Sequence, residues 1–364
     1  MSKLFETTSI NNMTLQNRFV RSATWEGMAN DDGSGTTRLA DYMKELARGG
    51  LGLIITGHAY VAKGGQAGLK QLGAYSDELL PGLNEITEAV RKQGGKIVLQ
   101  LAHAGCHAAS NLSGLGPVGP SVMENENGPV CREITQDDIR GIVNAFRQGA
   151  SLAERSGFDG VQIHGAHGYL LSQFLSPYYN KREDEYGGAI ENRARIILEV
   201  LQSIRAEVGD KYPVMIKMNS EDFLDNGLNV EDMLQVAEML EKSGIDAIEL
   251  SGGTSMSGKY NPVRRTRFDS EEKEVFYKSA AERYKEKIRV PLMLVGGIRS
   301  YSVAEQLVNK GTSDYIALCR PLIREPHLIN RWKSGDTAKA TCLTDNKCFK
   351  PAMEGKGLYC VNDE

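Results

Sequence analysis

The chain has 364 residues, with 43 Lys and Arg against 47 Asp and Glu, and a formal net charge of −4 at pH 7. No apolar run approaches the roughly 18 residues needed to cross a bilayer, no basic cluster indicates a nucleic-acid partner, and the first ten residues lack the apolar core of a secretory signal. These features disfavour a membrane protein or a nucleic-acid binder. They predict a cytoplasmic enzyme or binder of small molecules.

Short apolar runs alternate with helical patterns along most of the chain. The runs are rich in β-branched residues, and they lie at 18–23, 51–56, 96–101, 159–164, 213–218, 246–251, 291–296 and 314–319. The segments 135–156 and 231–243 repeat apolar residues at helical spacing. Eight strand-then-helix units predict an α/β fold of the (β/α)8, or TIM, barrel type. No GxGxxG motif follows any run, which disfavours an open dinucleotide-binding sheet.

The chain is longer than the ~250 residues typical of such a barrel, so the surplus is expected in loops. Residues 105–133 are rich in turn-forming residues and are expected to form a long active-site loop. Residues 252–269, which contain NPVRRTRF, form a second long loop. No linker or change of composition marks a second domain. We therefore expect a barrel over residues 1–340 and a short C-terminal tail over residues 341–364.

The cysteines are too few for a disulfide framework in a chain of this length, and nothing in the sequence indicates an oxidising compartment. We therefore expect free thiols. Three of them fall in the C-terminal tail. The six residues are Cys106, Cys131, Cys319, Cys342, Cys348 and Cys360.

Barrel enzymes carry their active sites at the C-terminal ends of the strands, so residues at these ends are the first candidates. Gly296 and Gly297 follow the seventh run and Arg320 follows the eighth, which favours a phosphate group bound by backbone N–H groups and a guanidinium. Lys217 lies in an otherwise apolar run, where a cation needs a ligand or a paired carboxylate. It could bind an electron-rich cofactor, form a Schiff base, or pair with a neighbouring strand.

The segment VQIHGAHGY places His164, His167 and Tyr169 at the end of the fourth run. Two imidazoles and a phenol at the mouth of a barrel can hydrogen-bond a carbonyl oxygen and deliver a proton. An H-x-x-H pair can also bind a metal, but no acidic third ligand accompanies this one. We therefore expect these residues to bind substrate rather than a metal ion.

Several motifs together resemble the Old Yellow Enzyme, or NADH:flavin oxidoreductase, family. They are HGAHGYLLSQFLSPYYNKREDEYGG followed by ENR, together with NRFVRSA, QLAHAG, GPS, VGGIRS and RPLIREP, and they extend over almost the whole chain. The resemblance implies a barrel that binds FMN and takes electrons from NADH or NADPH. It also implies an ene-reductase, which reduces activated C=C bonds of α,β-unsaturated carbonyl or nitro compounds, and a homo-oligomer.

The same resemblance implies roles for single residues. His164 and His167 would bind the substrate oxygen, where negative charge develops, while Tyr169 gives a proton to the α-carbon and flavin N5 gives hydride to the β-carbon. Lys217 stands where the family commonly has Arg, near flavin N1 and O2. Trp25 stands where relatives often have Cys or Thr. The other implied cofactor-binding residues are Ala23, Thr24, Gly57, Gln100, Gly296, Gly297, Cys319 and Arg320.

The tail resembles the cysteine run that binds a [4Fe–4S] cluster in longer relatives, the 2-enoate and 2,4-dienoyl-CoA reductases. In this chain the second cysteine position holds Asp345, which leaves Cys342, Cys348 and Cys360. Cluster ligation normally uses four thiolates. We therefore expect a remnant of an iron–sulfur site rather than a working cluster.

Two other enzyme classes remain open. A flavin dehydrogenase working in the oxidative direction would need a Cys or Ser base on an active-site loop, and Cys106 is the only nearby candidate. A Schiff-base aldolase would use Lys217 as its nucleophile.

Overall fold

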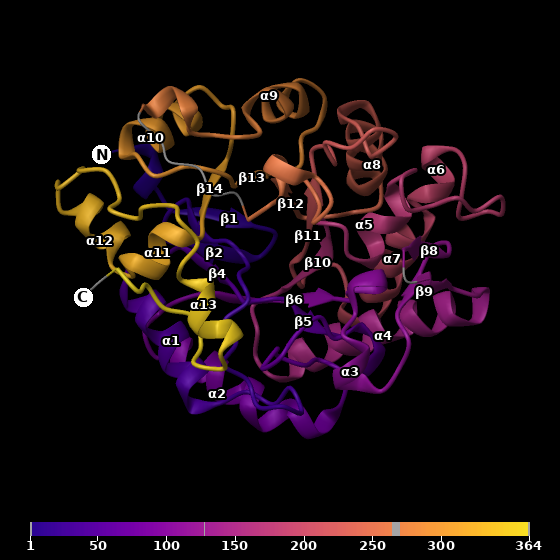
Figure 1. Cartoon of the computed structure of the whole chain (residues 1–364). Helices are drawn as coiled ribbons and strands as arrows, with labels where there is room; N and C mark the ends of the chain where they lie inside the picture. Colours follow the sequence, from indigo (N-terminus) through magenta and orange to yellow (C-terminus); the bar gives the residue numbers. More distant parts are fainter. Residues whose placement is uncertain (1, 127, 264–269, 363–364) are drawn as a thin grey trace.

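The computed structural model describes residues 2–126, 128–263 and 270–362, and its centre is a closed barrel of eight parallel strands (Figure 1). The strands pair in the order β10-β11-β12-β13-β14-β3-β4-β6, and β6 pairs with β10 to close the ring. The (β/α)8 fold expected from the sequence is confirmed. The strands are β3 (Phe19–Arg21), β4 (Leu53–Ile55), β6 (Ile97–Ala102), β10 (Val161–Gly165), β11 (Val214–Asn219), β12 (Ala247–Ser251), β13 (Leu292–Leu294) and β14 (Tyr315–Leu318).

Amphipathic helices connect successive strands and surround the barrel (Figure 1). Each buries an apolar stripe, and α4 begins with a capping box in which Thr135 and Asp138 exchange hydrogen bonds. The connecting helices are α1 (Thr37–Arg48), α2 (Leu80–Arg91), α4 (Gln136–Arg155), α7 (Arg195–Val208), α8 (Val230–Lys242), α9 (Lys278–Lys287) and α10 (Tyr301–Asn309), and α11 (Arg320–Arg324) and α12 (Leu328–Lys333) follow β14.

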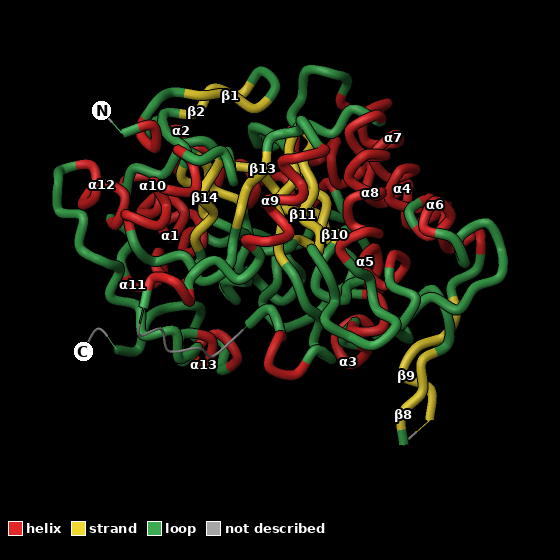
Figure 2. Tube along the Cα trace, turned by 90° about the horizontal axis from the view of Figure 1, so that it is seen from above, coloured by secondary structure: helices red, strands yellow, loops and turns green. Residues whose placement is uncertain are grey.

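A short hairpin closes the N-terminal end of the barrel. Its strands, β1 (Thr8–Ile10) and β2 (Met13–Leu15), lie at the end of the molecule opposite the tail helix α13 (Phe349–Met353), as Figure 2 shows. Ile10 and Met13 are buried in one cluster with inward-facing side chains of the barrel strands. The sequence did not predict this hairpin because strands of three residues are too short to show a period.

The insertion between β6 and α4 forms a small sheet. β7 (Val118–Gly119) and β8 (Met123–Asn125) both pair with β9 (Gly128–Glu133), and β8 and β9 project from the barrel as an arm (Figure 2). In the second insertion, 252–269, residues 264–269 lie outside the described part of the chain. NPVRRTRF can therefore be followed only as far as Val263.

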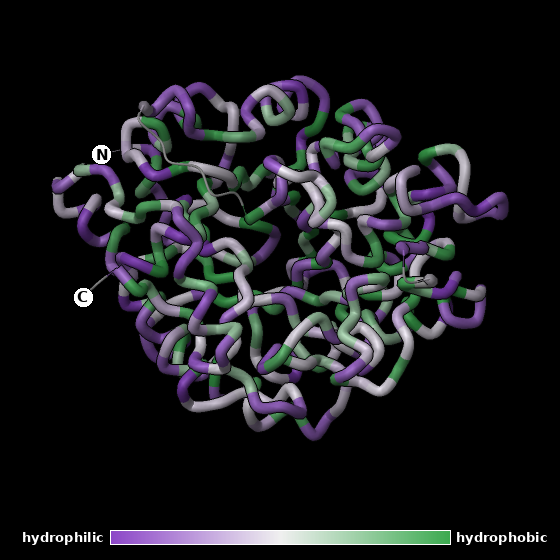
Figure 3. Tube along the Cα trace, viewed as in Figure 1, coloured by the Kyte–Doolittle hydropathy of each residue, from purple (hydrophilic) through white to green (hydrophobic). Residues whose placement is uncertain are grey.

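Hydropathy follows the layers of the fold. Apolar residues run along the barrel strands and the inner helix faces, and hydrophilic residues gather on the peripheral loops (Figure 3). Among the residues that the structure describes, no helix combines the length and the apolar character needed to cross a bilayer.

The tail lies against the loop that follows β3. The Leu358 N–H donates a hydrogen bond to the Glu26 carbonyl oxygen at 2.8 Å. Gly27 lies so close to α13 that a Cβ at this position would stand 3.1 Å from the Ala352 Cβ. The tail is thereby fixed at the end of the barrel where the strands have their C-termini.

Candidate functional site

A cavity of about 680 Å³ lies at the C-terminal ends of the barrel strands. Its walls come from the ends of seven strands, from the loop after β12, and from the tail. The site residues expected from the sequence that line it are Ala23, Thr24, Trp25, His164, His167, Tyr169, Lys217, Cys319 and Arg320. The barrel thus brings together side chains that are almost 300 positions apart in the chain.

His164, His167 and Tyr169 converge on one side of the cavity. The ring centroid of His164 lies 5.4 Å from that of His167 and 5.0 Å from that of Tyr169. His164 Nδ1 is buried and has no hydrogen-bond partner among the described residues. Buried polar atoms normally have partners, so this nitrogen points to a ligand atom. The arrangement can bind an oxygen atom beside a phenolic proton.

His167 adopts a backbone conformation that is uncommon for a residue with a side chain. Its φ is +63°, in the left-handed region, and Gly168 follows with a φ of +78°. The His167 N–H donates to Asn219 Oδ1 at 3.1 Å, and its Nε2 lies 2.7 Å from Ser251 Oγ. Neighbouring strands therefore hold this strained turn in place.

His58 is a site residue that the sequence analysis missed. It follows β4, lines the cavity, and places its Nε2 3.2 Å from the Tyr169 hydroxyl. Its position just past a strand end is the signal that could have selected it, whereas Gly57 beside it was named on the family resemblance. Burial first, and then the charge of Lys217, lower the pKa of His58 to about 4.

His164, His167 and Tyr169 are also held in their neutral forms. Burial, followed by the charges of Lys217 and the neighbouring histidines, holds the pKa values of His164 and His167 well below their ordinary range. Burial raises the pKa of Tyr169. At neutral pH the imidazoles are therefore uncharged hydrogen-bonding groups, and the phenol keeps its proton.

Lys217 reaches the cavity from β11 and pairs with Glu249 on the neighbouring strand β12. Its Nζ lies 3.1 Å from Glu249 Oε1 and 2.8 Å from Ser22 Oγ, and the two ion-paired side chains are 3% and 0% exposed. The pairing with a neighbouring strand, one of the three roles considered for Lys217, is therefore present. Lys217 also lines the cavity.

The end of β3 forms another part of the wall. Thr24 Oγ1 lies 2.8 Å from Cys319 Sγ, which joins the ends of β3 and β14. Trp25 Nε1 is buried without a hydrogen-bond partner among the described residues. It is a second polar group in the cavity wall that a ligand can satisfy.

Gln100 and Gly57 lie behind the cavity wall rather than in it. Gln100 Nε2 donates to Gln162 Oε1 at 2.6 Å. The Gly57 N–H donates to Glu26 Oε1 at 2.8 Å, and a Cβ on Gly57 would come within 2.3 Å of the other Glu26 oxygen. Their contact with a cofactor remains a prediction.

The residues expected to bind phosphate lie at one end of the site. Gly296, Gly297 and Arg320 line a smaller hollow that shares Cys319 and Arg320 with the cavity. Arg320 Nη1 donates to Asn346 Oδ1 at 2.7 Å. FMN combines a flat ring, a polar pyrimidine edge and an anionic phosphate. A cavity with unpartnered polar atoms and a cation, next to two glycines and a guanidinium, fits such a group.

The tail contributes part of the cavity wall, which the sequence did not predict. Asn346, Phe349 and Met353 line the cavity together with Pro262 and Val263 from the loop after β12. One side of the cavity therefore carries imidazoles and a phenol, and another carries apolar side chains.

The donor set in the tail does not fit a [4Fe–4S] cluster. Three cysteines, Cys342, Cys348 and Cys360, line one small pocket with Asp345, whose Oδ2 accepts a hydrogen bond from Asn362 at 3.2 Å. The tail itself supplies three thiols, whereas cluster ligation normally needs four. Across residues 2–126, 128–263 and 270–362, no group of three or more His, Cys, Asp or Glu side chains is arranged to hold a metal ion.

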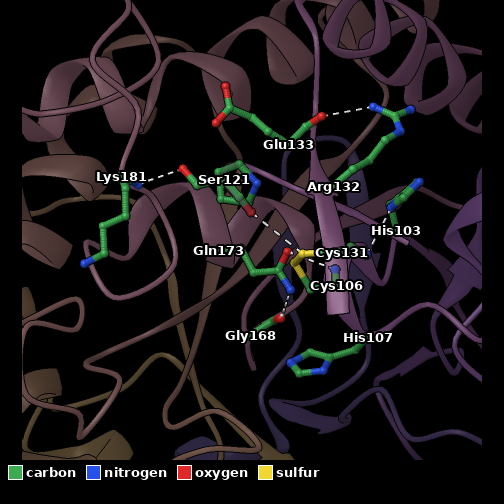
Figure 4. Close-up of a disulfide and its surroundings, with 12 residues drawn as sticks. His103, Cys106, His107, Ser121, Cys131, Arg132, Glu133, Gly168, Gln173 and Lys181 are labelled. Atoms are coloured by element: carbon green, nitrogen blue, oxygen red, sulfur yellow. Dashed lines mark hydrogen bonds between the residues drawn. A yellow bond between two sulfur atoms is a disulfide. The ribbon is translucent and has the colours of Figure 1, made fainter. Parts of the chain in front are cut away.

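Cys106 and Cys131 form a disulfide, which corrects the expectation of free thiols (Figure 4). The two residues are 25 positions apart, but the insertion folds back so that β9 and the turn Gly105–His107 bring their Cα atoms to 5.1 Å. Gly119 leaves the space that the bridge needs, because a Cβ there would stand 2.2 Å from Cys106 Sγ. Composition alone could not reveal this proximity.

Gln173 connects the disulfide to the segment that carries His167 and Tyr169. Its Oε1 accepts a hydrogen bond from the Cys106 N–H at 3.2 Å, and its Nε2 donates to the Gly168 carbonyl oxygen at 2.7 Å (Figure 4). Gly168 lies between His167 and Tyr169. The disulfide-bonded loop is therefore fixed to the segment that carries two of the polar residues of the cavity.

Known proteins resemble the chain over most of its length. Residues 3–338 match the NADH:flavin oxidoreductase / NADH oxidase family. The chain is 36% identical over 337 residues to an NADH oxidase of Thermoanaerobacter brockii, which covers 91% of this chain and 51% of that protein. The chain thus spans about half the length of this curated relative.

The fold is also similar to those of enzymes whose structures have been solved. The fold matches 2-naphthoyl-CoA reductase with a TM-score of 0.90 and 28% sequence identity, over 98% of this chain and 56% of that one. It matches an Old Yellow Enzyme homologue from Zymomonas mobilis with a TM-score of 0.79 and 26% identity, over 94% and 95% of the two chains.

Proposed function

Because the chain belongs to the NADH:flavin oxidoreductase / NADH oxidase family, whose members use FMN and NADH or NADPH, we propose that it reduces activated C=C bonds of α,β-unsaturated carbonyl or nitro compounds. One observation carries the proposal: His164, His167 and Tyr169 converge on one side of the cavity. A reduction of this kind needs hydrogen-bond donors for the substrate oxygen and a proton donor close by.

FMN, when bound, supplies hydride transfer from the nicotinamide to the substrate. His164 and His167 donate hydrogen bonds to the carbonyl or nitro oxygen of the substrate and stabilise the negative charge that develops there. Tyr169 donates its phenolic proton to the α-carbon. His58, whose Nε2 lies 3.2 Å from the Tyr169 hydroxyl, orients that hydroxyl. The four residues divide the work between binding, orientation and proton transfer.

The cofactor would be held by residues on the other walls. Lys217 would lie at the pyrimidine edge of the flavin, and the Gly296 and Gly297 backbone with Arg320 would hold the phosphate. Ala23, Thr24, Trp25 and Cys319 would contact the ring. Phe349 and Met353, from the tail, would cover the apolar side of the cavity and exclude water.

Two observations argue against the other enzyme classes. Cys106, the candidate base of a flavin dehydrogenase, is bonded to Cys131 and has no free thiol. Lys217 Nζ is held by Glu249 and Ser22, whereas a Schiff-base lysine must be free to attack the substrate carbonyl.

The visible spectrum of the purified, anaerobic protein tests the proposal. We expect resolved flavin bands that bleach on addition of NADH or NADPH and return on addition of cyclohexenone, with saturated cyclohexanone as the product. A flavin that returns only when oxygen is admitted would contradict the ene-reductase proposal. A protein that cannot be loaded with FMN would contradict the assignment of the cavity.

We also propose that the protein acts in the cytoplasm on small-molecule substrates and assembles as a homo-oligomer, as the composition and the family resemblance lead us to expect. Light scattering coupled to size-exclusion chromatography gives the mass of the assembly. A mass of 39.9 kDa would correspond to one chain and contradict the expected oligomer.

A further inference from the structure

A buried carboxylate stands directly behind the lysine of the cavity. Glu249 is fully buried and does not line the cavity, whereas Lys217 and Ser22 do. Lys217 and Glu249 are register partners on the adjacent parallel strands β11 and β12, which places their side chains next to each other inside the barrel. The Lys217 ammonium therefore faces the cavity, and the Glu249 carboxylate lies behind it in the barrel interior.

Every oxygen of this carboxylate is engaged. Glu249 Oε1 accepts from Ser22 Oγ at 2.6 Å and lies 3.1 Å from Lys217 Nζ, and Oε2 accepts from Gln162 Nε2 at 2.9 Å. Gln162 is held in turn by Gln100 at 2.6 Å. Burial of a charge is costly unless it is paired and hydrogen-bonded, and here the partners come from the end of β3 and from the strands β10 and β11. The proposed function gives Glu249 no task.

We propose that Glu249 is a positioning residue that sets the reduction potential of the bound flavin by pairing with Lys217. The inference rests on the proposed function only in requiring FMN beside Lys217. It assigns to Glu249 a lowering of the potential, so that the reduced cofactor becomes a stronger hydride donor.

The physical reason is charge balance. Hydride from NADH or NADPH brings two electrons and one proton to the flavin, and the nicotinamide leaves as NAD⁺ or NADP⁺. The ring therefore gains one net negative charge. An isolated Lys217 cation would stabilise that charge strongly in a buried site. A carboxylate 3.1 Å behind the ammonium offsets most of the cation's field, while its hydrogen bonds keep the ammonium in one position.

The test is a reductive titration of FMN-loaded enzyme with dithionite against a reference dye. Glu249→Gln keeps the shape and a hydrogen-bond acceptor for Lys217 but removes the negative charge. We expect the equilibrium constant for reduction to rise at least tenfold, which for a two-electron couple is about 30 mV. Asp246→Asn is the matched control, because it removes a carboxylate paired with Arg205 just before the same strand, at the opposite end of the barrel. For Asp246→Asn we expect the equilibrium constant for reduction to change less than threefold.

A double variant keeps the inference testable even if the single variant leaves Lys217 buried without a counter-charge and fails to fold. Lys217→Gln combined with Glu249→Gln removes both charges, and we expect its equilibrium constant to lie within threefold of the wild type. A fall of more than tenfold in the double variant would show that Lys217 acts unopposed. An unchanged potential in Glu249→Gln would likewise overturn the inference.

The two proposals fail in different ways. The dithionite titration needs neither a nicotinamide nor an unsaturated substrate, so its outcome bears on Glu249 alone. A wild-type protein that binds FMN but does not reduce cyclohexenone would remove the ene-reductase proposal and leave the Glu249 inference standing.

Discussion

Three neutral histidines and one protonated phenol form the polar wall of the cavity. Their pKa values are shifted toward the uncharged forms chiefly by burial, with Lys217 adding to the shift of the imidazoles. A neutral imidazole can donate one hydrogen bond and accept another, so His58 can face the Tyr169 hydroxyl without a charge between them. The proton that the proposed reaction needs is therefore held on the phenolic oxygen of Tyr169.

Tyr169→Phe tests this assignment. Removing the general acid should slow reoxidation of the reduced enzyme by cyclohexenone at least 100-fold, with little change in the rate of reduction by NADH or NADPH. Stopped-flow absorbance follows the two half-reactions separately. Tyr212→Phe is the control, since its hydroxyl bonds the Phe158 carbonyl oxygen at 3.0 Å, away from the cavity, and neither half-reaction should change. Equal slowing of both half-reactions by Tyr169→Phe would remove it from the proton-donor role.

The lowered pKa of His58 predicts how stability depends on pH. The unfolded chain binds a proton at His58 near its ordinary pKa of about 6.5, but the folded protein does so only near pH 4. Between these values the unfolded state holds more protons, so the free energy of unfolding falls as the pH is lowered, by about 1.4 kcal/mol per pH unit for this group.

Urea denaturation at pH 7.0 and pH 5.0 measures the effect. In His58→Gln the loss of stability between the two pH values should be smaller than in the wild type. The same loss in both proteins would mean that His58 is not held neutral in the folded state. Tyr212→Phe, which changes no histidine, is the control variant, for which we expect the wild-type loss.

Two segments outside the barrel strands, the insertion between β6 and α4 and the C-terminal tail, help to build the site. The insertion between β6 and α4 is anchored by the disulfide and, through Gln173, to the carbonyl of Gly168. The tail supplies Phe349 and Met353 to a cavity whose polar wall comes from strand ends. Both segments lie outside the (β/α)8 repeat. The tail lines the cavity directly, and the insertion contacts the segment between His167 and Tyr169.

The disulfide should contribute to stability. Closing a loop of 25 residues restricts the unfolded chain by about 3 kcal/mol in the chain-entropy description. Cys131→Ser should lower the free energy of unfolding by roughly 2–4 kcal/mol, and dithiothreitol should do the same to the wild type but not to the variant. Cys342→Ser, which removes a free tail thiol, is the control. A wild type insensitive to the reductant would contradict the prediction.

Phe349 should help to retain the cofactor. Its side chain forms part of the cavity wall, so Phe349→Ala removes apolar contact worth roughly 1–2 kcal/mol, and the dissociation constant of FMN should rise about tenfold. Fluorescence titration of the apoprotein with FMN measures it. Lys350→Ala, a change in the same helix at an exposed position, should leave the constant unchanged. An effect of equal size in both variants would point to a loosened helix instead.

For the whole molecule, the sequence predicted the barrel strands closely, because each buried strand is a short apolar run bounded by turn residues. The predicted run 213–218 is observed as Val214–Asn219, and 246–251 as Ala247–Ser251. His164, His167 and Tyr169 could be selected because barrel sites lie just past strand ends. Gln100, named on resemblance, lies behind the cavity wall and bonds Gln162.

What the sequence could not predict depends on contacts between distant segments. The pairing of Cys106 with Cys131, the counter-charge of Lys217 on β12, and the place of Phe349 in the cavity wall all require the three-dimensional arrangement. His58 was visible as a strand-end residue, but no motif distinguished it. Composition and the spacing of apolar residues predict local structure, whereas these features depend on packing between helices, strands and loops that are distant in the sequence.

The β1–β2 hairpin has a kinetic consequence. It fills the N-terminal end of the barrel with apolar side chains, so every ligand of the cavity must enter and leave through the opposite end. If nicotinamide and acceptor both use the place in the cavity beside the flavin, they exclude each other and react in turn, so we expect a ping-pong sequence. Initial rates measured at several fixed concentrations of cyclohexenone should give parallel lines in double-reciprocal plots against NADH or NADPH, and each substrate should inhibit competitively against the other at high concentration.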